Sequence, residues 1–174
     1  PCQPKEVVAR VAQADAATVD QAVAAARAAY PGWRRTSVSD RAALLECVAG
    51  RLEARRFELA AWMVIEVAKT WREADAEVSE TIDYCNYYAK EIVRIGSRPR
   101  RRDIEGETNE YAYQPRGVAA VLAPWNFPLA LLTNMVAAAV VTGNAVVMKP
   151  ASPAPASFST SISLLPRRAR RRAS

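Results

Sequence analysis

The sequence contains no histidine and only three cysteines, Cys2, Cys47 and Cys85, which lie far apart and form no CxxC pair. Neither a metal site nor a disulfide framework is therefore indicated, and reduced thiols are typical of the cytoplasm. No apolar run approaches the roughly 20 residues that a membrane helix needs, and the first residues lack the charged and then apolar order of a signal peptide. We therefore predict a cytoplasmic protein without a metal site and without a membrane partner.

Positive charge is in excess but is unevenly distributed. The formal charge is +6, yet five arginines lie within residues 167–174 and the rest of the chain is nearly neutral. A second basic cluster, at residues 98–102, lies beside Gly96 and Ser97 and is interpreted as a solvated loop. Neither cluster has interleaved aromatic residues that would stack on bases. We do not expect a nucleic-acid partner, although a basic tail that binds nucleic acid stays an alternative.

Four segments of the first hundred residues have apolar side chains at helical spacing. They run from Ala16 to Tyr30, from near Ser37 or Ser39 onwards, from about Phe57 to Ala68, and from Trp71 to Gly96. Asp15 is expected to cap the first helix and Pro31-Gly32 to end it. The apolar stripe of the long fourth helix consists of Ala74, Val78, Ile82, Cys85, Ala89 and Ile92.

The pattern changes after the basic cluster. Residues 109–114 alternate aromatic and polar side chains, and Val118 to Ala123 is a continuous apolar run, both typical of strands. An almost wholly apolar helical segment runs from Leu129 to Thr142, and a second apolar strand runs from Ala145 to Met148. Such an order predicts a right-handed parallel βαβ unit. The expected fold class is α/β, with a helical layer followed by the first βαβ unit of a doubly wound parallel sheet.

Two polar residues follow the two expected strands, where open parallel sheets bind ligands. Asn126 comes just after the first strand and Lys149 just after the second. An amide there can donate to a developing oxyanion, and an ammonium can bind a ribose hydroxyl or a phosphate. Each has a structural alternative, since Asn126 could cap the helix that Pro128 opens and Lys149 could be an ordinary surface lysine.

The surrounding residues favour the chemical interpretation. Residues 124–128 read PWNFP and residues 142–151 read TGNAVVMKPA, with the apolar helix between them. This combination resembles the aldehyde dehydrogenase superfamily. Residues 57–63, 66–75 (EVAKTWREAD) and 111–118 (YAYQPRGV) resemble its L-glutamate γ-semialdehyde (1-pyrroline-5-carboxylate) dehydrogenase branch in particular. The resemblance extends from about residue 5 to residue 152.

The resemblance implies an oxidoreductase of proline catabolism that converts L-glutamate γ-semialdehyde to L-glutamate with NAD and that is a homo-oligomer at full length. It implies that Asn126 stabilises the oxyanion and that Phe127 borders the aldehyde channel, a core role at the helix entry being an equal alternative for Phe127. The implied NAD-binding residues are Leu122, Ala123, Pro124, Trp125, Lys149 and Ser152. Ser152 replaces a glutamate of many members, and Ala68 replaces a usual glycine on what is expected to be a helix.

The family's cysteine nucleophile, glutamate base and second glycine-rich NAD contact are missing from the sequence, so we expect an inactive N-terminal fragment. Residues 1–152 would form an incomplete NAD-binding part. Residues 153–174, rich in Ser, Pro and Arg, would form an aberrant tail such as an out-of-frame reading produces. None of the three cysteines has a neighbouring cation or helix N-terminus that would activate it. The alternative is a non-catalytic fragment that binds a partner through exposed strand edges.

Overall fold

The computed structural model describes residues 7–96 and 100–157, apart from the side chains of residues 100–103. Cys2, most of the predicted tail and its arginine cluster lie outside the described residues. The elements, in chain order, are α1 (Ala16–Trp33), α2 (Val38–Ala54), α3 (Arg56–Val67), α4 (Trp71–Gly96), β1 (Arg100–Ile104), β2 (Glu107–Tyr111), β3 (Val118–Leu122), α5 (Ala130–Val141) and β4 (Ala145–Lys149).

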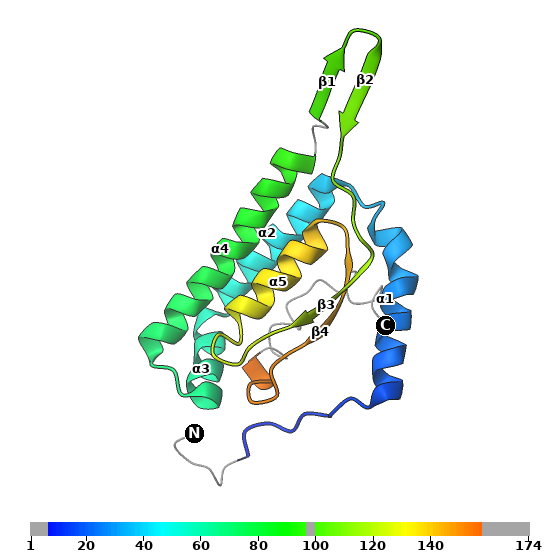
Figure 1. The fold of residues 1–174 in the computed structure, drawn as a ribbon. Helices are drawn as coiled ribbons and strands as arrows, with labels where there is room; N and C mark the ends of the chain where they lie inside the picture. Colours follow the sequence, from blue (N-terminus) through cyan, green and yellow to red (C-terminus); the bar gives the residue numbers. More distant parts are fainter. Residues whose placement is uncertain (1–6, 97–99, 158–174) are drawn as a thin grey trace.

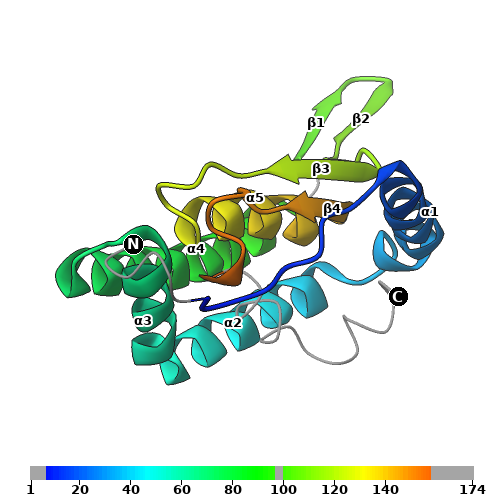
Figure 2. The same ribbon diagram turned by 90° about the horizontal axis from the view of Figure 1, so that it is seen from below.

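Helix α5 lies between a layer of helices and a small sheet. Figure 1 shows α2, α4 and α5 side by side, with the β1–β2 hairpin extending away from them. In Figure 2 the strands β3 and β4 lie on the opposite side of α5 from α2. This sandwiched position explains why α5 is apolar almost all round and why its sequence has no polar face.

The core lies where α2, α3, α4 and α5 meet. Its largest fully buried side chains include Leu52, Leu59, Met63, Val78 and Leu129. Burying each such side chain stabilises the fold by about 1.5–3 kcal/mol. The predicted stripe of α4 is confirmed for Ala74, Val78, Cys85, Ala89 and Ile92, which are buried, and Ile82 packs against them in part. The same stripe also contains Glu77 and Thr81, which were not predicted to be buried.

Side chains cap three of the helices. Asp15 is the N-cap of α1, as predicted, and Ser37 is the N-cap of α2. At the start of α4 the Thr70 hydroxyl accepts from Glu73 N at 3.3 Å, while the Glu73 carboxylate accepts from Thr70 N at 3.0 Å. This reciprocal capping box lowers the pKa of Glu73, chiefly through the hydrogen bond from the Thr70 hydroxyl.

The predicted end of the first helix was wrong, because α1 continues through Pro31 to Trp33. Two tertiary hydrogen bonds secure the last turn on either side of the proline. Tyr30 OH donates to Pro115 O at 3.0 Å, and Trp33 Nε1 donates to Val140 O at 3.0 Å. These contacts offset the disruption that an internal proline causes.

The interpretation of the basic cluster as a loop was also wrong for its second half. Strand β1 pairs antiparallel with β2, from Arg100↔Tyr111 to Ile104↔Glu107, around a turn in which Gly106 has φ 85°. Strand β2 therefore ends at Tyr111, whereas the alternation of residues 109–114 predicted a strand that continues to residue 114. Backbone pairing and the turn set this register, and every β2 side chain is exposed, so side-chain polarity carried little signal.

The predicted βαβ unit is confirmed. Strands β3 and β4 pair in parallel, from Val118↔Ala145 to Leu122↔Lys149, and α5 connects them. Gly143 ends α5 with φ +93°, a conformation that a side chain would strain. Asn144 Oδ1 then accepts from Arg116 N at 2.7 Å and Gly117 N at 3.0 Å, which joins the starts of the two strands. Within residues 7–96 and 100–157, no helix combines the length and apolarity that a membrane span requires.

Ala68 does not lie within a helix, contrary to expectation. It ends α3 with φ 59° and ψ 31°, the left-handed conformation in which a Cβ costs about 1–2 kcal/mol. Alanine's helix propensity is therefore irrelevant at this position. The sharp turn at Ala68 matters for the site because the next residue is Lys69.

Residues 153–157 pack back onto α3. Ala154, Ala156 and Ser157 are buried, and the Glu66 carboxylate accepts from Ala156 N at 2.6 Å and Ser157 N at 2.7 Å. Packing thus continues beyond Ser152. The division of the chain at Ser152 into a domain and a tail stays a prediction.

Candidate active site

The turn formed by residues 124–128 leads from the end of β3 towards α5. The last strand contact is a 3.4 Å hydrogen bond from Ala123 N to Lys149 O, and the first helical bond after the turn runs from Leu131 N to Phe127 O. Pro124, Trp125, Asn126 and Phe127 are exposed, whereas Pro128 and Leu129 are buried. The turn is therefore a surface feature attached firmly at both ends, at the carboxyl edge of the parallel strands.

The structural alternative for Asn126 is contradicted, because it does not cap α5. The helix begins at Ala130, and its N-cap residue, Leu129, makes no side-chain capping bond. Instead, Oε1 of Glu77 on α4 accepts from Leu129 N at 2.9 Å and from Ala130 N at 3.0 Å. A residue 52 positions earlier in the sequence thus satisfies the first N–H groups of α5.

Glu77 is fully buried and is paired with a cation. Its side chain is 0% exposed, and Lys69 Nζ, on a side chain that is 12% exposed, forms an ion pair with its Oε2. The same ammonium lies 3.9 Å from the centroid of the Phe127 ring, in cation–π geometry. A buried carboxylate is tolerable only when its oxygens have such partners. Lys69 therefore joins a buried charge to the exposed turn.

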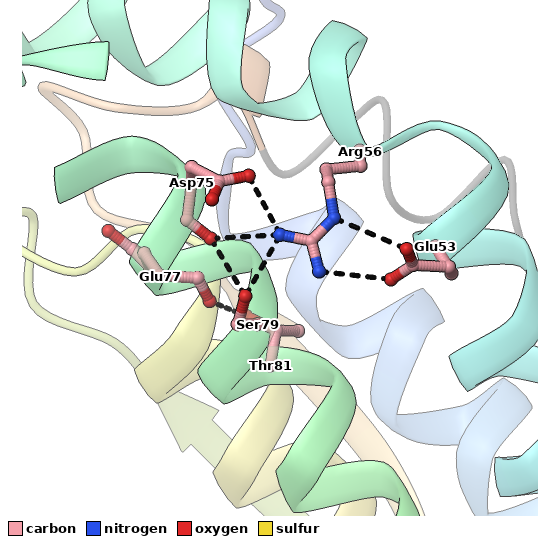
Figure 3. A network of polar contacts seen from close by, with 6 residues as sticks. All are labelled: Glu53, Arg56, Asp75, Glu77, Ser79 and Thr81. Atoms are coloured by element: carbon pink, nitrogen blue, oxygen red, sulfur yellow. Dashed lines mark hydrogen bonds and ion pairs between the residues drawn. The ribbon is translucent and has the colours of Figure 1, made fainter. Parts of the chain in front are cut away.

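The main-chain side of Glu77 belongs to a second polar network, shown in Figure 3. Arg56 Nη1 donates to Asp75 Oδ1 at 2.7 Å and to Ser79 Oγ at 2.9 Å, while its Nη2 donates to Glu53 at 3.1 Å. Glu77 itself takes part only through its carbonyl, which accepts from Thr81, and its carboxylate points away from Arg56. Arg56 thus ties α2 and α3 to the early turns of α4, on which Glu77 lies.

A pocket of about 380 Å³, open to solvent, lies beside the turn. Its lining combines the turn with the start of α4, and consists of Ala68, Lys69, Glu73, Ala76, Glu77, Glu80, Asn126 and Phe127. Two consecutive residues that the sequence singled out, Asn126 and Phe127, therefore line one cavity with residues of α4. Phe127 is 40% exposed, so the alternative in which it is a core residue is contradicted.

The six residues predicted to bind NAD lie outside that pocket, along the ends of β3 and β4. Leu122 and Lys149 are directly opposite each other in the strand register. Leu122 and Trp125 are 67% and 56% exposed, which is unusual for large apolar side chains, and Lys149 and Ser152 are exposed as well. Lys149 Nζ donates to the carbonyl of the next residue, Pro150 O, at 3.1 Å.

Two contributors to the site, Lys69 and Glu77, were missed as functional residues. Lys69 was part of a recognised segment but received no role, because its position after a left-handed turn is not visible in the sequence. Glu77 left a signal, since it falls at helical spacing between Ala74 and Thr81 on the apolar stripe of α4. A charged residue on a buried stripe needs a partner, and that requirement could have indicated it.

The described cysteines do not supply a nucleophile to this site. Cys85 is buried in the core, and burial raises the pKa of its thiol to about 12, so that it is not a thiolate at neutral pH. Cys47 is exposed on α2. Neither cysteine lines the pocket beside Asn126.

The sequence of the chain matches that of the aldehyde dehydrogenase family over residues 1–167, and the chain therefore belongs to this family. The match includes residues beyond Ser152, where the resemblance had been expected to stop. Membership accounts for the parallel βαβ unit with the turn of residues 124–128 after its first strand. It also places the chain in an oxidoreductase family.

Among its relatives, the chain is similar to 1-pyrroline-5-carboxylate dehydrogenase 2 of Bacillus subtilis, with 42% identity over 155 residues. The alignment covers 89% of this chain and 30% of that protein, so the chain spans about 30% of the length of the curated relatives it matches. A 1-pyrroline-5-carboxylate dehydrogenase from Thermus with bound NAD has a TM-score of 0.83 and 37% identity, covering 88% of this chain and 30% of that one. Proline utilization A from Bdellovibrio bacteriovorus has a TM-score of 0.83 and 41% identity, covering 87% and 16%.

Proposed function

We propose that this chain forms the first part of an NAD-dependent 1-pyrroline-5-carboxylate dehydrogenase, which oxidises L-glutamate γ-semialdehyde to L-glutamate. The similarity to the Bacillus subtilis and Thermus enzymes supports the substrate and the cofactor. The observation that carries the proposal is the position of Asn126. Its amide lies at the carboxyl edge of the parallel strands, lines a pocket and is not used to cap α5.

Asn126 is the proposed oxyanion donor. When a nucleophile adds to an aldehyde, negative charge develops on the carbonyl oxygen, and a preorganised N–H donor stabilises that charge. A side-chain amide is uncharged and has two N–H donors, so it can donate a hydrogen bond to the oxyanion without a change in its own protonation state. The neighbouring Phe127 ring would form an apolar wall that excludes water from the aldehyde.

The exposed residues at the strand ends fit NAD. Leu122, Ala123, Pro124 and Trp125 provide an apolar surface for flat rings, while Lys149 and Ser152 provide donors for ribose hydroxyls. When bound, NAD supplies the acceptor for the hydride that leaves the aldehyde carbon. The large exposed apolar area of Leu122 and Trp125 supports this assignment, because such surface is costly unless a ligand or a partner covers it.

The test is a chimera in which the 155 matched residues of this chain replace their counterparts in the Bacillus subtilis relative. In this chimera Asn126→Ala should lower turnover by about a hundredfold or more, the usual loss for one oxyanion donor. Its melting temperature should not change, because Asn126 is exposed and does not cap the helix. NADH formation from glutamate semialdehyde and thermal unfolding are measured on the same preparation.

Gln21→Ala is the matched control, since it removes an exposed side-chain amide from α1, which contributes no residue to the pocket. The control should keep the parent's turnover. An Asn126→Ala chimera with a normal rate would refute the oxyanion role. An inactive parent chimera, or one that prefers another aldehyde, would refute the proposed substrate.

Three further proposals concern the whole protein. The chain by itself should show no turnover, since it offers no activated thiol among its described residues. Cytoplasmic location is supported by the two unpaired cysteines, which suit a reducing compartment. Assembly into a homo-oligomer at full length is supported by the projecting β1–β2 hairpin, in which every β2 side chain is exposed.

A further inference from the structure

The N-terminus of α5 is held by a residue that belongs to another helix. Leu129 and Ala130 are 1% and 0% exposed, so their N–H groups have no access to water. Both groups donate to the single oxygen Oε1 of Glu77. Without that oxygen, two buried donors would be left unsatisfied at the point where the turn of residues 124–128 enters the helix.

The second oxygen of Glu77 connects this buried cap to the surface. It is paired with Lys69, whose ammonium also lies over the Phe127 ring at 3.9 Å from its centroid. Lys69 reaches this place because Ala68 turns the chain sharply at the end of α3. The turn is thus restrained at Phe127 by the cation and at Leu129 by the carboxylate.

Asn126 lies immediately before both restraints, and its own backbone is preceded by the strand contact at Ala123. Its direction into the pocket therefore depends on where Phe127 and Leu129 are held. We propose that Glu77 and Lys69 form a positioning pair that orients the Asn126 amide at the pocket. The inference rests on the proposed oxyanion role of Asn126 and deepens it, because it assigns the residues through which α4 controls that amide.

Catalysis is sensitive to such positioning. A displacement of about 1 Å at a reacting group can cost on the order of a hundredfold in rate. A carboxylate that only stabilised the helix would instead affect the fraction of folded molecules and leave the rate of each folded molecule unchanged. These two roles can be separated by experiment.

The catalytic arm uses the same chimera with Glu77→Gln and Lys69→Met. Gln keeps a carbonyl acceptor for α5 but loses the charge that holds Lys69, and Met keeps the stem of Lys69 but loses the ammonium. Each should lower kcat by about tenfold to a hundredfold per folded molecule while leaving the KM for NAD nearly unchanged, since positioning affects the reacting group and not the cofactor surface.

Lys69→Arg, which retains a cation, should recover most of the rate. Glu91→Gln changes a partly exposed carboxylate on the same helix that is paired with Arg94; it is the matched control and should keep the parent rate.

A double variant gives the sharpest result. If Glu77 acts through Asn126, Glu77→Gln should cause no further loss when it is added to Asn126→Ala, so the two effects are strongly non-additive. If the rate losses of the two single variants multiply in the double variant, the positioning role is refuted. It is also refuted if Glu77→Gln and Lys69→Met keep a normal rate per folded molecule while Asn126→Ala is slow. Neither result would refute the oxyanion role of Asn126.

The second arm needs no catalysis and uses the 174-residue chain itself. Nitrogen-15 relaxation should show ordered amides at Trp125, Asn126 and Phe127, with order parameters falling to below about 0.6 in Glu77→Gln and in Lys69→Met. Glu91→Gln should not change them. A turn that stays equally ordered in both variants would disprove the restraint. If this arm succeeds while Asn126→Ala remains fully active in the chimera, the proposed oxyanion role fails and the restraint stands as a structural one.

Discussion

The two ends of α5 are held by opposite charges that both come from the helical layer. At the N-terminus, Glu77 of α4 accepts from two N–H groups. At the C-terminus, Arg41 of α2 donates through Nε to Val141 O at 2.7 Å. Its Nη1 donates to Thr36 O, just before α2, at 2.5 Å. Both charges have the sign that complements the helix dipole.

The difference between the ends lies in what surrounds each charge. Glu77 has a counter-ion, Lys69, which also contacts an exposed aromatic ring beside a pocket. Arg41 is 8% exposed, and its burial lowers its pKa, although a guanidinium remains protonated. Gly143 lies next to Arg41 at that end, and neither residue lines the pocket beside Asn126. At the C-terminus of α5 the charge of Arg41 therefore stabilises the fold. At the N-terminus the charge of Glu77 also contacts, through Lys69, a surface that a ligand can reach.

The largest effect on stability is expected from breaking the N-terminal end. Glu77→Ala leaves two buried N–H groups and the largely buried Lys69 without their partner, and should lower the free energy of unfolding by about 3–5 kcal/mol. Glu91→Ala removes a partly exposed carboxylate of the same helix and should change it by less than about 1 kcal/mol. Urea unfolding followed by circular dichroism measures both. Equal values for the two variants would contradict the importance of the buried cap.

A smaller loss is expected at the C-terminal end. Arg41→Met removes two charge-assisted hydrogen bonds but leaves no charged partner buried, so the free energy of unfolding should fall by about 2–3 kcal/mol. Arg94→Met is the control, because Arg94 is exposed and pairs with Glu91 three residues before it on α4. In the chimera, Arg41→Met should keep the turnover per folded molecule. An Arg41→Met chimera that is stable but has a low turnover would contradict the view that only the N-terminal end of α5 affects catalysis.

The smallest effect on stability is expected at Ala68, the residue whose turn places Lys69 beside Glu77. Ala68→Gly relieves a left-handed alanine and should raise the free energy of unfolding by about 1 kcal/mol, after allowance for the greater freedom of glycine in the unfolded chain. The same substitution at Ala24, exposed within α1, should lower it by about 1 kcal/mol. Two shifts of the same sign in thermal melts would show that the strain at Ala68 is compensated elsewhere.

Much of the fold was predictable because its signals are local. Periodic apolar residues located all four long helices, Asp15 and Ser37 marked helix starts, and the apolar runs around PWNFP located the βαβ unit. The rule that parallel strands present their carboxyl ends together located Asn126 and Lys149 at one edge of the sheet, but it did not predict the pocket that Asn126 and Phe127 line with α4. Strand β1 was missed because its sequence, RRRDI, has no apolar alternation. The end of α1 was missed because distant hydrogen bonds outweighed the proline.

The sequence by itself determined the order and type of the main elements, the parallel βαβ unit and the edge at which its polar residues gather, since these depend on residue spacing along the chain. Only the tertiary structure decided which groups satisfy the ends of α5 and what holds the turn at Asn126. Glu77 lies 52 residues before Leu129, and Arg41 lies 100 residues before Val141. The desolvation of a charge and the choice of its partner depend on distances in space, and such pairs leave no period in the sequence.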